Sequence, residues 1–503
     1  MFKKISISTI MCGIVGIMNN DNNNFVNQSI VHSLTFLQHR GQDSAGIYSL
    51  HNNCFYKCKN LGKVSDVFNK NNIINLKGAL GIGHVRYSTS GSVSLEQAQP
   101  FYTDNPYGIA LVHNGNLTNT RELMETMKKC NRHINTTSDS EVLLCIFSQL
   151  LASKKIEDNI ISDIFESVGE LMRMCRGGYS VIMIINNVGL LAFRDPYGIR
   201  PLCYGERKAG TNTTERDYIF SSESVAIDSL ADGFQLTRDV QPGECVLITN
   251  HCEFHSKIMS KKTALMPCIF EYIYFARPDS VIDEILVYEA RNKMGEVLAN
   301  KILKIMPDYR EKIDVIMPIP ETSRFSALAI ANSLKIPYSE GYIKNHYISR
   351  TFIMPNQEIR KKNIKLKLST IKKEFMDKNV LIIDDSIVRG TTSIELVQLA
   401  REAGAKAVYF ASVAPPVSFP NVYGIDIPTR EELIANGRTI EEICEILKAD
   451  KVIFNELKEV EQACIDLNPK IKGFETSCFN GKYITGNINE EYLQLLERNR
   501  SRQ

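Results

Sequence analysis

Apolar positions before residue 250 fall in short runs that are broken by Asn, Gly and Pro. The runs at 179–185 and 189–193 have the length and composition of antiparallel strands. Two longer stretches, 29–38 and 140–152, carry apolar residues at helical spacing. The first half is therefore predicted to be an α+β domain, in which stacked antiparallel sheets lie between helix layers.

The pattern changes after about residue 285. Apolar runs at 315–318, 380–383 and 408–412 alternate there with helical stretches, which is the βαβ pattern of a parallel sheet. The second half is therefore predicted to be an α/β domain. From Asn487 the chain is charged and helical in pattern, and we expect a peripheral C-terminal helix.

Composition narrows the class of protein. A chain of 503 residues with 44% hydrophobic residues can form two sizeable cores. The balance of 59 basic and 57 acidic side chains argues against a nucleic-acid partner. No apolar run reaches about 18 residues, so no membrane partner is expected. Thirteen cysteines without repeated spacing predict reduced thiols in a cytoplasmic protein.

The stretch VLIIDDSIVRGTTS, residues 380–393, carries the most chemistry. A buried strand ends in Asp384 and Asp385, at the edge where open α/β sheets bind ligands. A turn then opens the helix predicted at 394–403, and its backbone N–H groups can bind an anion. The residues of this turn that can hold a phosphate are Arg389, Gly390, Thr391, Thr392 and Ser393.

This segment resembles the phosphoribosyl pyrophosphate (PRPP) motif of type I phosphoribosyltransferases. The resemblance implies that the acid pair holds the ribose hydroxyls and that the following loop holds the 5′-phosphate. A bare acid pair is usually a solvated loop, but the order of strand, acid pair, loop and helix favours the functional interpretation. Neither a P-loop nor a dinucleotide fingerprint is present.

Cys12 begins the apolar run CGIVGI near the start of the chain. Removal of residues 1–11, as a propeptide or an upstream extension, would give Cys12 a free α-amine with a pKa of about 8. That amine could act as the base for its own thiol. The alternative without a catalytic role is a buried cysteine that packs against a first strand. A signal peptide at residues 1–11 is a further alternative, which is less favoured because no small residue immediately precedes Cys12.

Three more segments suit glutamine chemistry. Arg86 at a predicted strand end can bind an α-carboxylate, and Asp139 at a predicted helix start can bind an α-ammonium. The Asn114 amide and the Gly115 N–H, after the strand LVH, can form an oxyanion hole. The alternatives are a surface ion pair, a helix N-cap and an Asn-Gly turn. Together with Cys12 and the segment QHRGQDSAG, they resemble class II glutamine amidotransferase domains.

A glutaminase half joined to a PRPP half resembles one family, the glutamine phosphoribosylpyrophosphate amidotransferases. The resemblance runs from Cys12 to about residue 490 and includes the segments FEYIYFARPDS, MPIPETSR, KNHYISRTFIMP and FPNVYGID. It implies the first committed step of purine synthesis, in which glutamine and PRPP give 5-phosphoribosylamine, glutamate and pyrophosphate. The implied domains are 12–260, 261–470 and a C-terminal segment 471–503.

The resemblance also implies further site residues. Lys344 and Arg350 are expected to contact pyrophosphate, and the basic run at 360–367 is assigned to a flap over PRPP. Ser323 is expected near a Mg²⁺ ion, together with the acid pair. Tyr274 and Arg277 are the candidates for coupling the two sites.

Some members of this family hold an iron–sulfur cluster on four cysteines. Here Cys268 and Cys478 match two ligand positions, whereas Asn421 and Glu475 occupy the other two. Two thiolates do not hold such a cluster in the usual way, so the cluster-free type is expected. The resemblance further implies a homotetramer and feedback inhibition by purine nucleotides.

Three alternatives stay open. A relative of glucosamine-6-phosphate synthase would share the Cys-first domain but should carry sugar-isomerase motifs instead of DDSIVRGTTS. A non-enzymatic PRPP sensor would lack the glutaminase residues. A chain whose N-terminus is never processed would use ammonia but not glutamine.

Overall fold

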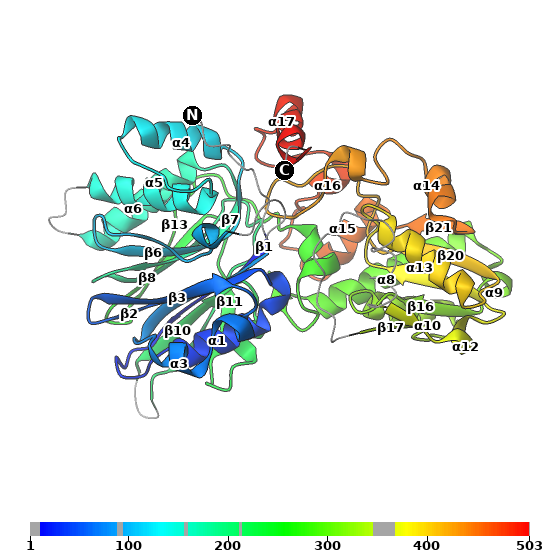
Figure 1. The fold of residues 1–503 in the computed structure, drawn as a ribbon, viewed down its shortest axis with the longest axis horizontal. Helices are drawn as coiled ribbons and strands as arrows, with labels where there is room; N and C mark the ends of the chain where they lie inside the picture. Colours follow the sequence, from blue (N-terminus) through cyan, green and yellow to red (C-terminus); the bar gives the residue numbers. More distant parts are fainter. Residues whose placement is uncertain (1–10, 88–93, 155–158, 211–213, 346–367, 502–503) are drawn as a thin grey trace.

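The computed structural model describes residues 11–87, 94–154, 159–210, 214–345 and 368–501. Figure 1 shows two halves side by side, with the N-terminal half on the left and the C-terminal half on the right. Among the residues described, no helix combines the length and the apolar character needed to cross a membrane.

Two antiparallel sheets form the centre of the N-terminal half. The seven-stranded sheet has the order β11-β9-β10-β1-β4-β2-β3, and the six-stranded sheet has the order β13-β12-β8-β7-β6-β5. The strands of the first sheet are β1 (Met11–Met18), β2 (Ser44–His51), β3 (Cys54–Leu61), β4 (Leu80–Tyr87), β9 (Cys203–Lys208), β10 (Arg216–Ser221) and β11 (Gln235–Asp239). Those of the second are β5 (Phe101–Thr103), β6 (Ile109–Leu117), β7 (Gly177–Ile185), β8 (Gly189–Arg194), β12 (Glu244–Thr249) and β13 (Phe254–Ile258).

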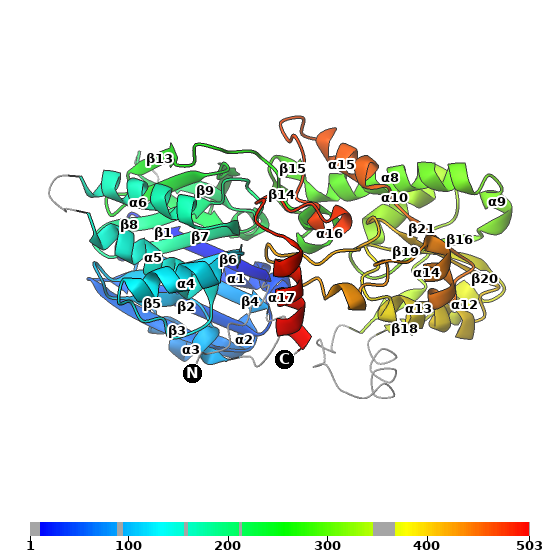
Figure 2. The same ribbon diagram turned by 90° about the horizontal axis from the view of Figure 1, so that it is seen from above.

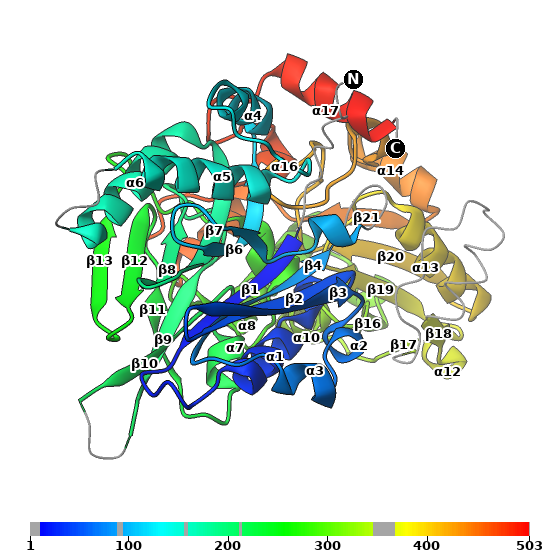
Figure 3. The same ribbon diagram turned by 60° about the vertical axis from the view of Figure 1, so that its left-hand side comes forward.

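Helices cover the outer faces of both sheets (Figures 1 and 3). The helices on the seven-stranded sheet are α1 (Asn27–Phe36), α2 (Val64–Val67), α3 (Lys70–Ile74) and α7 (Val225–Asp228). Those on the six-stranded sheet are α4 (Thr120–Lys129), α5 (Asp139–Ala152) and α6 (Ile160–Met174). Alternate residues of β1 explain the layers, because Ile14 packs between the sheets while Val15 packs under α1.

A four-stranded parallel sheet of order β16-β19-β20-β21 forms the core of the C-terminal half. Its strands are β16 (Val315–Pro318), β19 (Asn379–Asp384), β20 (Ala407–Ser412) and β21 (Lys451–Phe454). One face packs on α8 (Val287–Ile305), α10 (Arg324–Leu334) and α15 (Leu457–Ile465), and the other on α12 (Lys372–Phe375), α13 (Thr391–Glu402) and α14 (Ile440–Leu447). Both faces of β19 are buried, which explains its uninterrupted apolar run.

Short elements complete this half. They are the hairpins β14 (Val281–Ile282) with β15 (Ile285–Leu286) and β17 (Tyr342–Lys344) with β18 (Leu368–Thr370), and the helices α9 (Tyr309–Lys312), α16 (Ser477–Asn480) and α17 (Glu490–Ser501). In the view from above, α17 lies between the two halves (Figure 2). The two halves meet around residues 268–280, a stretch that we call the junction. The C-terminal segment contacts it, since the Ile269 N–H donates to the Glu475 carbonyl at 3.2 Å.

The predicted architecture is confirmed, with element ends that differ from the predicted ones by at most three residues. One local prediction is wrong: Asn114 and Gly115 do not form a turn but lie inside β6. Gly115 has φ +140°, and a Cβ there would lie 2.1 Å from the Gly178 carbonyl oxygen. The Asn-Gly pair is therefore needed for a close approach between β6 and β7 and not for a chain reversal.

Candidate active sites

Cys12 lies on β1 directly opposite Arg86 on β4. Both side chains are buried. The Arg86 Nη2 group donates to the Gln97 side-chain oxygen at 2.7 Å, whereas its buried Nη1 group has no hydrogen-bond partner among the described residues. A buried guanidinium with a free donor is suited to a carboxylate ligand.

Burial raises the pKa of the Cys12 thiol to about 12, although the nearby guanidinium groups of Arg86 and Arg200 oppose the shift. A thiol in this environment is protonated at neutral pH and is a poor nucleophile. Activation therefore needs a base close to the sulfur atom.

The two oxyanion candidates lie on the neighbouring sheet. The Asn114 side chain is fully buried, and neither its amide nitrogen nor its amide oxygen has a partner among the described residues. Buried amides without protein partners are uncommon, and a ligand or a water can supply the missing hydrogen bonds. The oxyanion role of Asn114 stays a prediction.

Asp139 is the first residue of α5, and Ser138 is the N-cap. One carboxylate oxygen of Asp139 accepts from the Leu117 N–H at 3.0 Å, so the carboxylate is fixed against the end of β6. His113 was not predicted from the sequence: its Nδ1 lies 3.0 Å from the Ser140 hydroxyl and 3.9 Å from Asp139. The signal was present, since His113 directly precedes Asn114.

The segment QHRGQDSAG forms part of a buried ion-pair network at the junction. Arg40 pairs with Glu223 through Nε and with Glu271 through Nη2, and Arg200 also donates to Glu271, at 2.6 Å. Burial alone would raise the pKa of Glu223, but His39 and Arg40 outweigh it and hold the pKa below its usual range. Glu271 belongs to the junction, so these contacts join the junction to the N-terminal half.

On the parallel sheet, Asp384 is the last residue of β19 and Asp385 follows it. One Asp384 oxygen accepts from the Asp385 N–H at 3.0 Å. Asp385 accepts from the hydroxyls of Thr322 and Ser386, the latter at 2.7 Å. Burial raises the pKa of both carboxyl groups, and the charge of Asp385 raises that of Asp384 further.

The loop after the acid pair leads directly into α13. Gly390 has φ +78°, and a Cβ there would lie 2.4 Å from the Ile434 side chain, so a glycine is required. Thr391, Thr392 and Ser393 form the first turn of the helix, where backbone N–H groups have no partner inside the helix. Arg389 is half exposed and lies 3.2 Å from Glu432.

Other predicted site residues lie at different distances from this centre. The Ser323 hydroxyl donates to the Ile319 carbonyl at 2.5 Å, so Thr322 and not Ser323 contacts the acid pair. Lys344 is exposed at the end of β17. Arg350 and the basic run at 360–367 lie outside the described residues.

The two coupling candidates are held in the junction by their backbones. The Arg277 N–H donates to Glu223 at 3.0 Å, while its side chain pairs with Asp279. The Tyr274 carbonyl accepts from Arg291 at 3.0 Å. Arg291, which was not predicted from the sequence, is buried; burial lowers the pKa of its guanidinium, and the charge of Asp385 opposes this shift.

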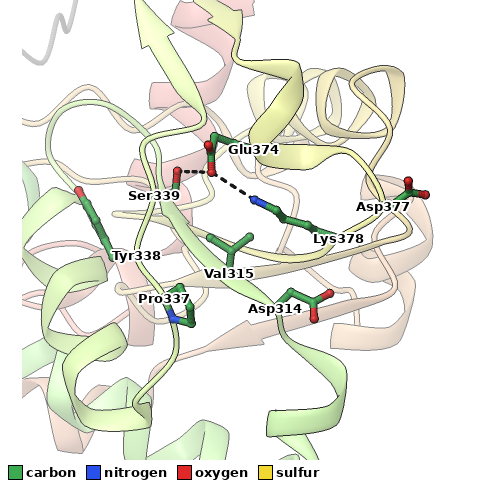
Figure 4. A pocket seen from close by; sticks show the side chains of 8 residues that line it. All are labelled: Asp314, Val315, Pro337, Tyr338, Ser339, Glu374, Asp377 and Lys378. Carbon is green, nitrogen blue, oxygen red and sulfur yellow. Dashed lines mark hydrogen bonds and ion pairs between the residues drawn. The ribbon is translucent and has the colours of Figure 1, made fainter.

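A separate cavity of about 480 Å³ lies at the amino-terminal ends of β16 and β19. Figure 4 shows Glu374 between Ser339 and Lys378, with which it makes hydrogen bonds of 2.8 and 3.2 Å. The acid pair follows the opposite ends of these strands. This cavity is therefore distinct from the candidate PRPP site.

Three of the four positions compared with cluster ligands contact one another at the junction. Cys268 and Glu475 form a β-bridge, and the Asn421 amide donates to Glu475 at 3.1 Å. The Ser477 N–H donates to the other Glu475 oxygen at 2.8 Å. Hydrogen bonds from Asn421 and Ser477 thus fix the Glu475 side chain, and no cluster is needed to hold these segments together.

The fold and these two sites define a class of protein, a glutamine amidotransferase joined to a phosphoribosyltransferase. A glutamine amidotransferase domain family matches residues 84–229, and a phosphoribosyl transferase domain family matches residues 286–417. An amidophosphoribosyltransferase of Haemophilus influenzae is 50% identical over 493 residues, which cover 98% of this chain and 96% of the relative. One of Saccharomyces cerevisiae is 45% identical and covers 97% and 95%.

Solved structures agree with the sequence relatives. A glutamine PRPP amidotransferase from Bacillus subtilis, complexed with ADP and GMP, superimposes with a TM-score of 0.81 at 32% identity and covers 95% of this chain and 98% of its own. The chain belongs to the amidophosphoribosyltransferase family.

Proposed function

We propose that this protein makes 5-phosphoribosylamine from glutamine, PRPP and water, with glutamate and pyrophosphate as the other products. This is the first committed step of purine synthesis. The observation that carries the proposal is the presence, in one chain, of Cys12 opposite Arg86 and of the acid pair directly before an anion-binding helix start.

In the glutaminase site, Arg86 binds the α-carboxylate of glutamine and Asp139 binds its α-ammonium. After removal of residues 1–11, the α-amine of Cys12 takes the thiol proton, and the sulfur attacks the side-chain amide. The Asn114 amide and the Gly115 N–H stabilise the oxyanion. The α-ammonium of Cys12 returns the proton to the amide nitrogen, which leaves as ammonia, and water then releases glutamate from the sulfur.

In the second site, Asp384 and Asp385 bind the ribose hydroxyls, and the loop 389–393 binds the 5′-phosphate. As the bond between C1 and pyrophosphate loosens, ammonia attacks C1. Ammonia is already a good nucleophile, so positioning of the reactants contributes most of the rate. Lys344 and Arg350 are assigned to the pyrophosphate.

The carboxylates of the acid pair suit Mg²⁺, which is commonly held by one or two carboxylates together with substrate phosphates. No group of three or more metal-binding side chains occurs in the part of the chain that the structure describes. Substrate oxygens would therefore have to complete the coordination. When bound, Mg²⁺ would neutralise charge that develops on the leaving pyrophosphate.

Further parts of the proposal concern organisation. We place the domains at 12–260 and 261–470, with 471–503 as a C-terminal segment, and we assign Tyr274 and Arg277 to coupling of the sites. The bound ADP and GMP of the Bacillus subtilis relative support purine nucleotides as inhibitors. A homotetramer is proposed from the family. All thirteen cysteines are free thiols, which supports a cytoplasmic location.

The experiment measures the release of glutamate and pyrophosphate at steady state, together with the intact mass of the same protein sample. A mature chain that begins at Cys12 and releases glutamate and pyrophosphate in equal amounts supports the proposal. A chain that retains Met1 and uses only ammonia would mean that residues 1–11 have not been removed and that the glutaminase site is inactive for this reason. Absence of any PRPP turnover would favour the sensor alternative, and Cys12→Ser is the control for glutamine use.

A further inference from the structure

A buried hydrogen bond joins the strand of the oxyanion hole to the C-terminal half. Asn116 lies on β6, two residues after Asn114, and its amide donates to the Val422 carbonyl oxygen at 2.8 Å. Asn116 is 3% exposed and Val422 is 1% exposed. A hydrogen bond in such a dry environment holds its two segments in a defined relative position.

The segment that carries Val422 begins at the acid pair. Directly after β20, the Val413 N–H donates to the Asp384 carbonyl at 3.0 Å, and the Ala414 N–H donates to the Asp385 carbonyl at 2.8 Å. The segment 413–425 therefore starts on the backbone of the two residues that are assigned to the ribose.

The far end of this segment is also fixed. The Asn421 side-chain oxygen accepts from the N–H groups of Tyr423 and Ile425, at 2.8 and 3.3 Å. The Tyr423 hydroxyl lies 2.8 Å from that of Thr485. Both ends of 413–425 are therefore held by hydrogen bonds, so that the segment forms a continuous physical link from the acid pair to Val422.

Close packing extends the contact to the neighbouring strand. Gly178 on β7 is the partner of Asn116, and a Cβ at Gly178 would lie 3.2 Å from the Tyr423 Cβ. The residue between the two asparagines is Gly115, whose N–H is assigned to the oxyanion hole. The path from the acid pair to this N–H therefore consists of two backbone hydrogen bonds, the chain from Val413 to Val422 and the side-chain amide of Asn116.

We propose that Asn116 is a positioning residue for glutamine hydrolysis. Its bond to Val422 fixes the end of β6 so that the Asn114 amide and the Gly115 N–H face the substrate amide. Through 413–425, this alignment depends on the state of the acid pair. The inference rests on the proposed function, and it assigns to Asn116 one of the contacts through which the two sites act on each other.

The route through Asn116 differs from the contact that Arg277 of the junction makes with the N-terminal half. The Arg277 N–H reaches Glu223, which follows β10 of the seven-stranded sheet that also holds Cys12 and Arg86. Asn116 belongs to the six-stranded sheet, which holds the oxyanion donors. The proposed path therefore acts on the oxyanion donors, and of the glutamine-binding groups only Asp139 lies near it, because the Leu117 N–H holds that carboxylate against the end of β6.

The test compares Asn116→Ala and Asn116→Asp with Asn487→Ala. The Asp variant keeps the shape but replaces the donor with an acceptor. Asn487→Ala is the control, because it removes another contact between distant segments. The Asn487 amide donates at 3.0 Å to the hydroxyl of Thr118, which lies two residues after Asn116. Each variant is assayed as the full chain for glutamate release with and without PRPP, for synthesis from ammonia, and for thermal unfolding.

Both Asn116 variants are expected to lower kcat for glutamine about tenfold or more, because misaligned oxyanion donors act on the transition state. The KM for glutamine should rise by less than kcat falls, because of the glutamine-binding groups only Asp139, held by the Leu117 N–H, lies next to Asn116. PRPP should stimulate glutamate release less than in the wild type. Synthesis from ammonia and the melting temperature should match those of Asn487→Ala.

Unchanged glutamine turnover in both variants would overturn the proposal. So would a parallel loss of ammonia-dependent synthesis, or an equal loss of kcat in Asn487→Ala, because either result means a general role in domain packing. A wild-type chain that never uses PRPP, even with ammonia, would instead refute the proposed function, so the two failures are distinguishable.

Discussion

Cys12 and Arg86 are direct cross-strand partners on β1 and β4. The pairing places a thiol next to a guanidinium on one buried patch of the sheet, so that a single substrate can contact both. Because the register of a sheet is fixed by its buried face, this relationship is not easily disturbed by changes at the surface.

Arg86→Lys should raise the KM for glutamine about tenfold to a hundredfold, because a charged hydrogen bond contributes about 1.5 to 3 kcal/mol and lysine lacks the planar fork. Ammonia-dependent synthesis should be unaffected. Steady-state kinetics with both nitrogen donors check this. Arg238→Lys, at a bidentate pair with Glu244, is the matched control. Loss of activity with both donors would contradict the assigned role.

The pH dependence of glutamine use should follow the Cys12 amine. Burial raises the pKa of the thiol to about 12, so the thiol itself does not ionise near neutral pH. The amine acts as a base only when it is neutral, so kcat/KM should fall as the pH drops below about 8. A profile that instead kept rising toward pH 12 would mean that the thiol ionises unaided.

Asp384→Asn should raise the KM for PRPP with either nitrogen donor, because the ribose loses a charged acceptor. In the wild type, burial and the neighbouring Asp385 raise the pKa of Asp384. The pair therefore takes up a proton as the pH falls, and the apparent affinity for Mg²⁺ and PRPP should fall with it. In the variant this pH dependence should weaken. An identical pH dependence in both proteins would argue against titration of the pair.

Glu223→Gln should destabilise the protein by about 3 to 5 kcal/mol near neutral pH, because the change leaves the buried Arg40 charge with one partner fewer. The pKa of folded Glu223 lies below its usual range, so its stabilising effect is complete above the unfolded pKa of about 4.3 and declines below it. Chemical unfolding at several pH values measures the difference. The control is Glu166→Gln, which changes an exposed partner of Lys154 and should leave the denaturant midpoint of unfolding unchanged.

Metal analysis tests the expectation of a cluster-free protein. Protein purified without oxygen should contain no stoichiometric iron and should keep its activity in air. Asn421→Cys with Glu475→Cys would add two thiols where Cys268 and Cys478 already lie, and only this double variant should be able to take up iron and sulfide. Stoichiometric iron in the wild type would contradict the expectation.

Much of the chemistry could be predicted because it is local. Residues 380–393 form a strand, a turn and a helix in one continuous stretch, and neighbouring residues decide each of these states through hydrophobic period and turn chemistry. The Asn-Gly pair misled the prediction for the same reason. Its local preference is a turn, but the pairing of β6 with β7 outweighs that preference.

The sequence by itself determined the two fold classes, the chemical groups of both sites and the family resemblance, since each depends on residue types at short spacing. Only the tertiary structure decided which groups meet: Cys12 with Arg86, Thr322 with Asp385, and Asn116 with Val422, 306 residues further along the chain. Such contacts arise when separate elements pack together, and hydrophobic period fixes which face of an element is buried but not which element covers it.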